Sequence, residues 1–153
     1  MDQQTRIVKT PKKFARALFI KKALKDRAFF FVRAGKKSKI AAKEILYALP
    51  GVFAMSLSAE GKEIRLIKEA DEFRIMENSE SSDILLKIRF HDLAVLRNIA
   101  SQETTLQKAF AERRISFSGQ TKYFTAIARV SAEGDKYDCS EAEYFDLYGK
   151  GKE

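Results

Sequence analysis

The spacing of hydrophobic residues changes at Gly51. Before this glycine, apolar side chains recur every three or four residues, as on one face of a helix. After it they alternate with polar ones in three short runs, 52–58, 63–68 and 72–76, separated by turns at 60–62 and 70–71. Alternation between short turns is typical of antiparallel strands, so we expect a three-stranded meander with one apolar face.

The stretch 83–130 continues this pattern with helices inserted. It has an alternating strand at 83–90, helical patterns at 91–101 and 104–113, a second strand at 115–118 that ends on Gly119, and a helical pattern at 123–130. Thr104 and Gln107 fit a capping box at the start of the second helix. Together the runs predict an α+β fold, with a five-stranded, mainly antiparallel sheet covered on one face by short helices.

The first third of the chain is expected to be a loose start followed by helices. Residues 1–9 show no period, and Thr10-Pro11 has the residues preferred at a helix start. We interpret 29–32 as the end of this helix or a short strand, and 35–39 as a loop before a helix that Pro50 ends. The apolar stripe of the first helix comprises Phe14, Ala17, Leu18, Leu24 and Ala28.

Positive charge is concentrated in the same region. Residues 1–44 hold 14 Lys and Arg against 3 Asp and Glu, whereas the rest holds 15 against 18. A basic segment attracts phosphate on lipid headgroups or on nucleic acid, and it can equally be a solvated helix face. The residues expected to contact a membrane or phosphate are Lys12, Lys13, Arg16, Lys21, Lys22 and Lys25.

Residues for catalysis or metal binding are scarce. His91 is the single histidine and Cys139 the single cysteine, and neither has metal-ligand spacing around it. We therefore expect no enzyme, no metal and no cofactor. The chain shows neither a membrane-spanning run nor a signal peptide, and one cysteine suits a reducing compartment. These features favour a cytoplasmic protein that can lie peripherally on a membrane.

Two segments resemble the sterol carrier protein type 2 domain family. They are 106–110, with the pair Ala109-Phe110, and 113–121, which ends in Gly119-Gln120-Thr121. Asp92 occupies the family's acidic position after the fourth strand. Arg113-Arg114 resembles the bacterial branch of ubiquinone-biosynthesis accessory proteins, although many members carry glycine at position 113 and that branch has Gly-Asp-Thr at the strand end. The resemblance covers about 38–132, between a basic amphipathic segment (1–37) and a C-terminal tail (133–153).

The resemblance implies a non-catalytic lipid carrier with a hydrophobic tunnel between sheet and helices. The implied ligand is a fatty acyl, sterol-like or prenyl-quinone-like tail, and the implied partners are lipids, an anionic membrane surface and biosynthetic enzymes. The expected lining residues are Phe53, Met55, Leu86, Ile88, Leu93, Leu96, Ile99, Leu106, Phe110, Ile115, Phe117, Phe124 and Ile127.

Two alternatives stay open at this point. The same apolar residues could form an ordinary packed core with no room for a ligand. The chain could also be a basic adaptor for nucleic acid or protein that lacks a lipid cavity, although its basic segment lacks the interleaved aromatic residues that stack on bases.

Overall fold

A computed structural model describes residues 2–37, 45–70 and 72–138 of the chain. Side chains are described for 15–33, 45–70 and 72–132. The loop expected around 38–39, the first half of the helix expected before Pro50, and most of the C-terminal tail lie outside these residues. The end of that helix is present, because residues 45–47 are helical.

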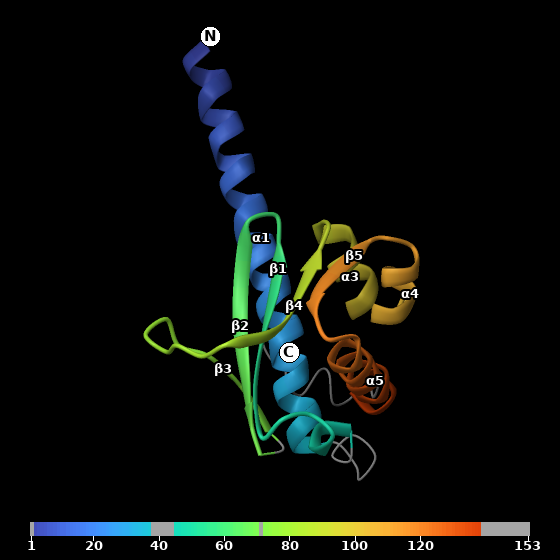
Figure 1. Ribbon diagram of the computed structural model, residues 1–153. Coiled ribbons are helices and arrows are strands. Elements are labelled where there is room, and N and C mark those ends of the chain that lie inside the picture. Colours follow the sequence, from blue (N-terminus) through green and yellow to red (C-terminus); the bar gives the residue numbers. More distant parts are fainter. Residues whose placement is uncertain (1, 38–44, 71, 139–153) are drawn as a thin grey trace, which may run out of the picture.

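The centre of the molecule is a five-stranded sheet of order β3-β2-β1-β4-β5 (Figure 1). Its strands are β1 (Val52–Ala59), β2 (Lys62–Glu69), β3 (Glu72–Ile75), β4 (Ile84–Phe90) and β5 (Ile115–Gly119). Three neighbouring pairs are antiparallel, while β1 and β4 run parallel, so the sheet is mixed. The predicted meander and the α+β class are confirmed.

One face of the sheet is apolar and carries the main core. Cross-strand register places Met55 of β1 beside Leu66 of β2 and Leu86 of β4, and all three side chains are buried. On β4 the polar side chains of Lys87 and Arg89 alternate with the buried residues and are exposed on the opposite face, as the sequence predicts. A second, small cluster on that face consists of Ala54, Ile67, Met76 and Ile84.

Helix α1 (Asp2–Lys37) is much longer than the sequence pattern predicts. The expectation of a loose segment at 1–9 is wrong for residues 2–9, which are helical, and Pro11 lies inside the helix, where it cannot donate to the carbonyl of Ile7. Residues 29–32 continue the helix rather than forming a strand, and the loop expected to begin at residue 35 is still helical through Lys37. The N-terminal part of α1 extends beyond the sheet, while its second half packs on β1, β2 and β3 (Figure 1).

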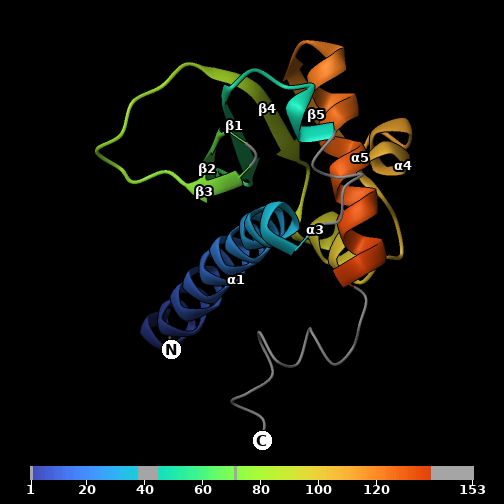
Figure 2. The same ribbon diagram turned by 90° about the horizontal axis from the view of Figure 1, so that it is seen from below.

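The other helices complete a layer on the same face of the sheet. They are α3 (Leu93–Ala100), α4 (Leu106–Ala111) and α5 (Thr121–Asp138). Helices α3 and α5 both contact α1, whereas α4 packs on β5 and α5 (Figure 2). The helical pattern expected at 123–130 belongs to a longer helix, since α5 continues to Asp138 and so enters the segment 133–153 that the sequence assigns to the C-terminal tail.

Candidate functional site

Twelve of the thirteen predicted lining residues lie in or against the core cluster between the sheet and its helical layer, and Phe110 lies at the surface. Eleven are buried within one cluster, namely Phe53, Met55, Leu86, Ile88, Leu93, Leu96, Ile99, Leu106, Ile115, Phe124 and Ile127. Phe117 is half-buried, and Phe110 is 44% exposed. The set therefore runs from the interior of the domain to its surface, and Phe110 is its exposed end.

Three phenylalanines from three elements meet at this exposed end. Phe117 of β5 stacks on Phe124 of α5, with ring centroids 4.3 Å apart and planes at 3°. Phe110 of α4 is tilted by 51° against both rings, at 5.1 Å from Phe117 and 5.4 Å from Phe124. We call these three residues the phenylalanine cluster. Exposure falls from Phe110 through half-buried Phe117 to Phe124, which is 5% exposed.

Short helix α4 holds Phe110 in place. Its N-cap is Thr105, whose hydroxyl accepts a hydrogen bond from the Lys108 N–H at 3.1 Å, so the cap lies one residue later than the predicted Thr104. Leu106 and Ala109 face inward and are buried. A six-residue helix has little stability of its own, so α4 depends on its contacts with β5 and α5.

The turn between β5 and α5 fixes the other two rings. Gly119 adopts φ +132°, and a Cβ there would lie 2.4 Å from the Leu85 carbonyl oxygen, so no side chain fits. The carbonyl of Gln120 then accepts from the N–H groups of Tyr123 and Phe124 and begins α5. The adjacent Tyr123 ring makes an edge contact with Phe53 of β1, at 5.3 Å between centroids.

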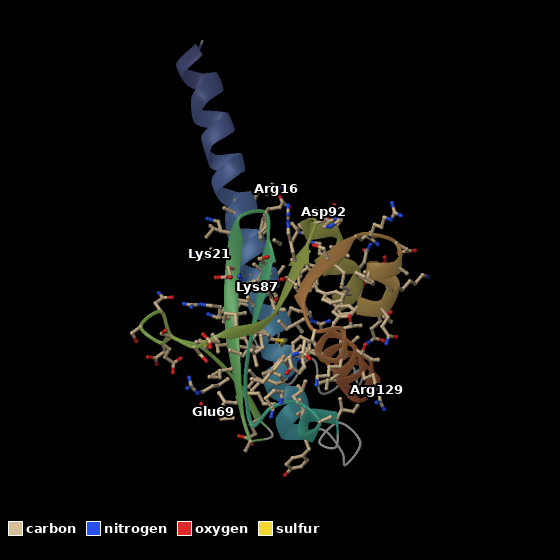
Figure 3. The ribbon with its side chains drawn as sticks, in the orientation of Figure 1. Arg16, Lys21, Glu69, Lys87, Asp92 and Arg129 are labelled. Atoms are coloured by element: carbon tan, nitrogen blue, oxygen red, sulfur yellow. The ribbon has the colours of Figure 1, made fainter. Side chains whose placement is uncertain are left out.

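The first turn of α3 is secured by two carboxylates. Asp92 is the N-cap and accepts from the Val95 N–H at 3.0 Å. Glu60, in the β1–β2 turn, accepts from the Leu93 N–H at 3.1 Å. The Arg16 guanidinium of α1 donates two hydrogen bonds to the same carboxylate, and these hydrogen bonds raise the pKa of Arg16. Arg16 and Asp92 are seen at the same end of the sheet in Figure 3.

Helix α1 presents a mixed apolar and basic face to solvent. Its core side contains Ile20, Leu24, Ala28 and Phe31, all buried. Opposite them, Leu18, Phe19 and Phe29 are 49%, 53% and 38% exposed. The lysines at 21, 22 and 25 are exposed as well, and the Lys25 ammonium lies 5.9 Å from the centre of the Phe29 ring. We call these six residues the outward face of α1.

Among the residues predicted to contact phosphate, those whose side chains are described do not form one group. Lys21, Lys22 and Lys25 belong to the outward face, whereas Arg16 is engaged by Glu60. The side chains of Lys12 and Lys13 lie outside the described part of the structure. Leu18 was predicted to share a stripe with Leu24 and Ala28, but it points away from them into solvent.

Sequence reasoning also missed Phe19, Phe29 and Glu60. Counting the helical period through Leu18, Lys22, Lys25 and Phe29, at i, i+4, i+7 and i+11, would have revealed the outward face.

His91 does not belong to any reactive arrangement that the structure describes. Its backbone N–H donates to the Arg114 carbonyl at 3.1 Å, and its side chain is exposed. Among the described residues, no group of three or more histidine, cysteine or acidic side chains could hold a metal ion. Over the same residues, no helix combines the length and the hydrophobicity that a membrane crossing requires.

The architecture matches two solved structures over most of their length. One is described as "UbiJ-SCP2 Ubiquinone synthesis protein", with a TM-score of 0.51 at 11% identity, over 79% of this chain and 94% of that one. The other is sterol carrier protein domain 2 of Helicoverpa armigera, also at 0.51 with 13% identity, over 74% and 89%. The chain has the sterol carrier protein 2 fold. The sequence itself matches neither a protein-family model nor a curated protein.

Within the sterol carrier protein 2 fold, the arginine pair at 113–114 has a structural explanation. Arg113 has φ +61°, and its N–H donates to the Phe110 carbonyl, while the Arg114 N–H donates to the Ala109 carbonyl. These two bonds make a Schellman ending for α4, in which glycine is the usual residue at the left-handed position. Arg113 thus occupies a glycine position, and it is exposed.

Arg114 instead ties two helix ends together. The side-chain amide of Asn98 is satisfied when its oxygen accepts from Arg114 Nη2 at 2.9 Å and Nη1 at 3.3 Å, and its nitrogen donates to Glu103 Oε2 at 3.1 Å. Asn98 lies in α3, and Arg114 follows α4. The pair therefore fixes the connection between the two short helices that cover the predicted lining residues.

Proposed function

We propose that this protein is a non-catalytic lipid carrier that holds a hydrophobic tail between its sheet and helices α3, α4 and α5. The candidate tails are fatty acyl, sterol-like and prenyl-quinone-like chains. Support comes from the sterol carrier protein 2 fold and from the apolar core cluster, which includes twelve of the thirteen expected lining residues. The prenyl-quinone class is included because one structural neighbour is named for ubiquinone synthesis.

The observation that carries the proposal is the graded exposure of the phenylalanine cluster. A large apolar ring that is 44% exposed costs free energy in water, yet Phe110 stands in contact with rings that lead directly into the core. Phe110 is the entry point in this proposal, and Phe117 and Phe124 line the first part of the path. A lipid chain arriving at Phe110 would exchange water for aromatic surface at each step inward.

Entry requires α4 and α5 to separate. Helix α4 is short and its main partners are β5 and α5, so it is the element of the layer that moves most easily. Burying ten methylene groups gains about 8 kcal/mol, which equals the binding free energy of a micromolar complex before the cost of opening is subtracted. Even moderate opening costs therefore leave measurable affinity for long chains.

The decisive experiment is native mass spectrometry of the purified protein, followed by titration with palmitate, cholesterol and a ubiquinone analogue. We expect co-purified lipid or stoichiometric uptake of at least one of the three classes. Phe110→Ser should weaken uptake about tenfold by removing roughly half of the burial energy of one phenylalanine. Tyr47→Ser is the matched control, because Tyr47 is 69% exposed and lies outside the apolar set.

Failure has a clear form in this experiment. A protein that purifies free of lipid and takes up none of the three probes would contradict the carrier proposal. Equal uptake by Phe110→Ser and the parent protein would leave the carrier function standing but would reject the phenylalanine cluster as its entrance.

We further propose that the carrier docks on anionic membranes through the outward face of α1. Exposed apolar side chains interleaved with lysines suit a bilayer interface, where rings enter the headgroup region and ammonium groups pair with phosphates. Reversing Lys21, Lys22 and Lys25 to glutamate should abolish co-sedimentation with vesicles containing phosphatidylglycerol. The control replaces Lys87, Arg97 and Lys108 with glutamate. It makes the same charge change at exposed positions elsewhere and should reduce co-sedimentation much less.

A further inference from the structure

From the outward face of α1 we infer a built-in competitor for the membrane: the C-terminal segment 139–148 of the same chain docks on that face. The inference rests on the proposed membrane role for its regulatory meaning, but the docking itself stands on the chemistry of the two surfaces. Helix α5 ends at Asp138, and fifteen further residues follow it.

The two surfaces are complementary in charge. The outward face of α1 has three exposed lysines, Lys21, Lys22 and Lys25, beside one exposed acidic residue, Asp26. Segment 139–148 has three acidic residues and no basic one. Its acidic side chains are Glu141, Glu143 and Asp146. Opposite net charges of this size attract across the Debye length and bring the segment to the helix.

The two surfaces are also complementary in apolar character, which charge alone would not require. The outward face exposes Leu18, Phe19 and Phe29 between its lysines. The segment carries four large apolar or aromatic side chains among its acids, Tyr144, Phe145, Leu147 and Tyr148. Contact between the two sets would cover exposed rings that otherwise remain in water, at about 25 cal/mol per Å² of apolar area.

The geometry allows the contact. Helices α5 and α1 touch, and Figure 2 shows the C-terminal end of α5 and the body of α1 on the same side of the sheet. Leu18 and Phe29 are about 16 Å apart along the helix axis, whereas ten extended residues reach about 33 Å. The segment is therefore long enough to span the outward face from Leu18 to Phe29.

The consequence is autoinhibition of membrane docking. The segment and an anionic bilayer would use the same lysines and the same apolar side chains, so only one of them can occupy the face at a time. Anionic lipid at high surface density displaces the segment, and a neutral bilayer does not. The carrier would thus dock where phosphate headgroups are dense and stay off other surfaces.

The test uses the full chain with a spin label. In a Cys139→Ser, Gly149→Cys background, a nitroxide at position 149 should broaden the amide resonances of 18–29 and leave those of β5 sharp. Glu141→Gln, Glu143→Gln and Asp146→Asn together should remove the broadening. The same three substitutions, without the label, should strengthen binding to equimolar phosphatidylcholine–phosphatidylglycerol vesicles about fivefold or more.

A charge exchange separates this inference from the membrane proposal. Reversing Lys21, Lys22 and Lys25 to glutamate should release the segment, and adding Glu141→Lys, Glu143→Lys and Asp146→Lys should restore the broadening without restoring vesicle binding. Broadening at 18–29 without vesicle binding in any variant would reject the membrane proposal alone. Absence of broadening in the parent chain, or broadening that appears only between mixed labelled and unlabelled copies, would overturn the docking inference.

Discussion

Arg16 of α1 and Glu60 of the β1–β2 turn form a two-pronged ion pair, with Nε 3.0 Å from Oε1 and Nη2 2.8 Å from Oε2. Glu60 Oε2 also accepts from the backbone N–H of Leu93, at the first residue of α3. One carboxylate therefore connects the long helix, the sheet and the helix that covers β4. The backbone of Glu60 has φ +47°, in the left-handed region that most residues avoid.

The first prediction concerns the two halves of this connection. Glu60→Ala should lower the free energy of unfolding by about 1 kcal/mol, because the Leu93 N–H loses its acceptor. Arg16→Ala removes only an exposed, salt-screened partner and should leave global stability nearly unchanged. Urea denaturation of both variants, with hydrogen exchange at the Leu93 amide, measures the difference. Equal destabilisation by the two substitutions would show that the ion pair, and not the backbone bond, secures α3.

The strands were predictable from sequence because the signal for each lies within the strand itself. In β4, alternate side chains from Leu86 to Phe90 are buried, and Lys87 and Arg89 are exposed, as simple alternation requires. The parallel pairing of β1 with β4 was not predictable. It joins segments separated by the whole meander, and no local pattern encodes which distant strand becomes a neighbour.

Residues that break the alternation of apolar and polar side chains could not be placed from the sequence. Lys68 lies on the apolar face opposite Phe53 and Phe73 and is only 1% exposed, which a binary pattern would exclude. Its ammonium donates to the carbonyl of Ala70 at the end of β2, so the long side chain runs along the core to a polar end. The candidate site shows the same limit: the lining residues were predictable as apolar, but their degree of exposure depends on how α4 packs.

A second prediction follows from the close approach at Gly119. Gly119→Ala should destabilise the protein by about 3 kcal/mol, since the added methyl would meet the Leu85 carbonyl oxygen, a backbone atom that cannot turn aside. Gly51→Ala is the control, because a Cβ there meets nothing within 4 Å, and it should change stability by less than about 0.5 kcal/mol. Thermal unfolding of the Gly119→Ala and Gly51→Ala variants measures the two changes in stability. A mild effect at position 119 would mean that β4 and β5 separate easily.

A third prediction concerns acid and the loop after β3. The Glu77 N–H and then the Arg74 guanidinium hydrogen-bond Glu80, and they lower the pKa of its carboxyl. A lowered folded pKa stabilises the loop at neutral pH, and this stabilisation is lost as pH falls below about 4.3, the ordinary glutamate value. Carbon-detected NMR titration should give Glu80 a midpoint below that value. Arg74→Ala should raise the Glu80 midpoint only part of the way to the ordinary glutamate value, because the hydrogen bond from the Glu77 N–H remains. A midpoint at the ordinary value would show that Arg74 alone lowers the pKa of Glu80.

The fourth prediction distinguishes the neighbouring arginines after α4. Arg113→Gly should raise the free energy of unfolding by about 0.5 to 1 kcal/mol, since glycine relieves the strain of φ +61° and the Schellman bonds from the backbone remain. Arg114→Ala should lower it by about 1 kcal/mol, because the side-chain oxygen of Asn98 then loses the guanidinium that donates to it. Opposite shifts in the urea midpoint are the expected result. Destabilisation by Arg113→Gly would mean that the Arg113 side chain makes a contact worth more than the backbone strain. In that event its role would lie with a headgroup or partner rather than at the helix end.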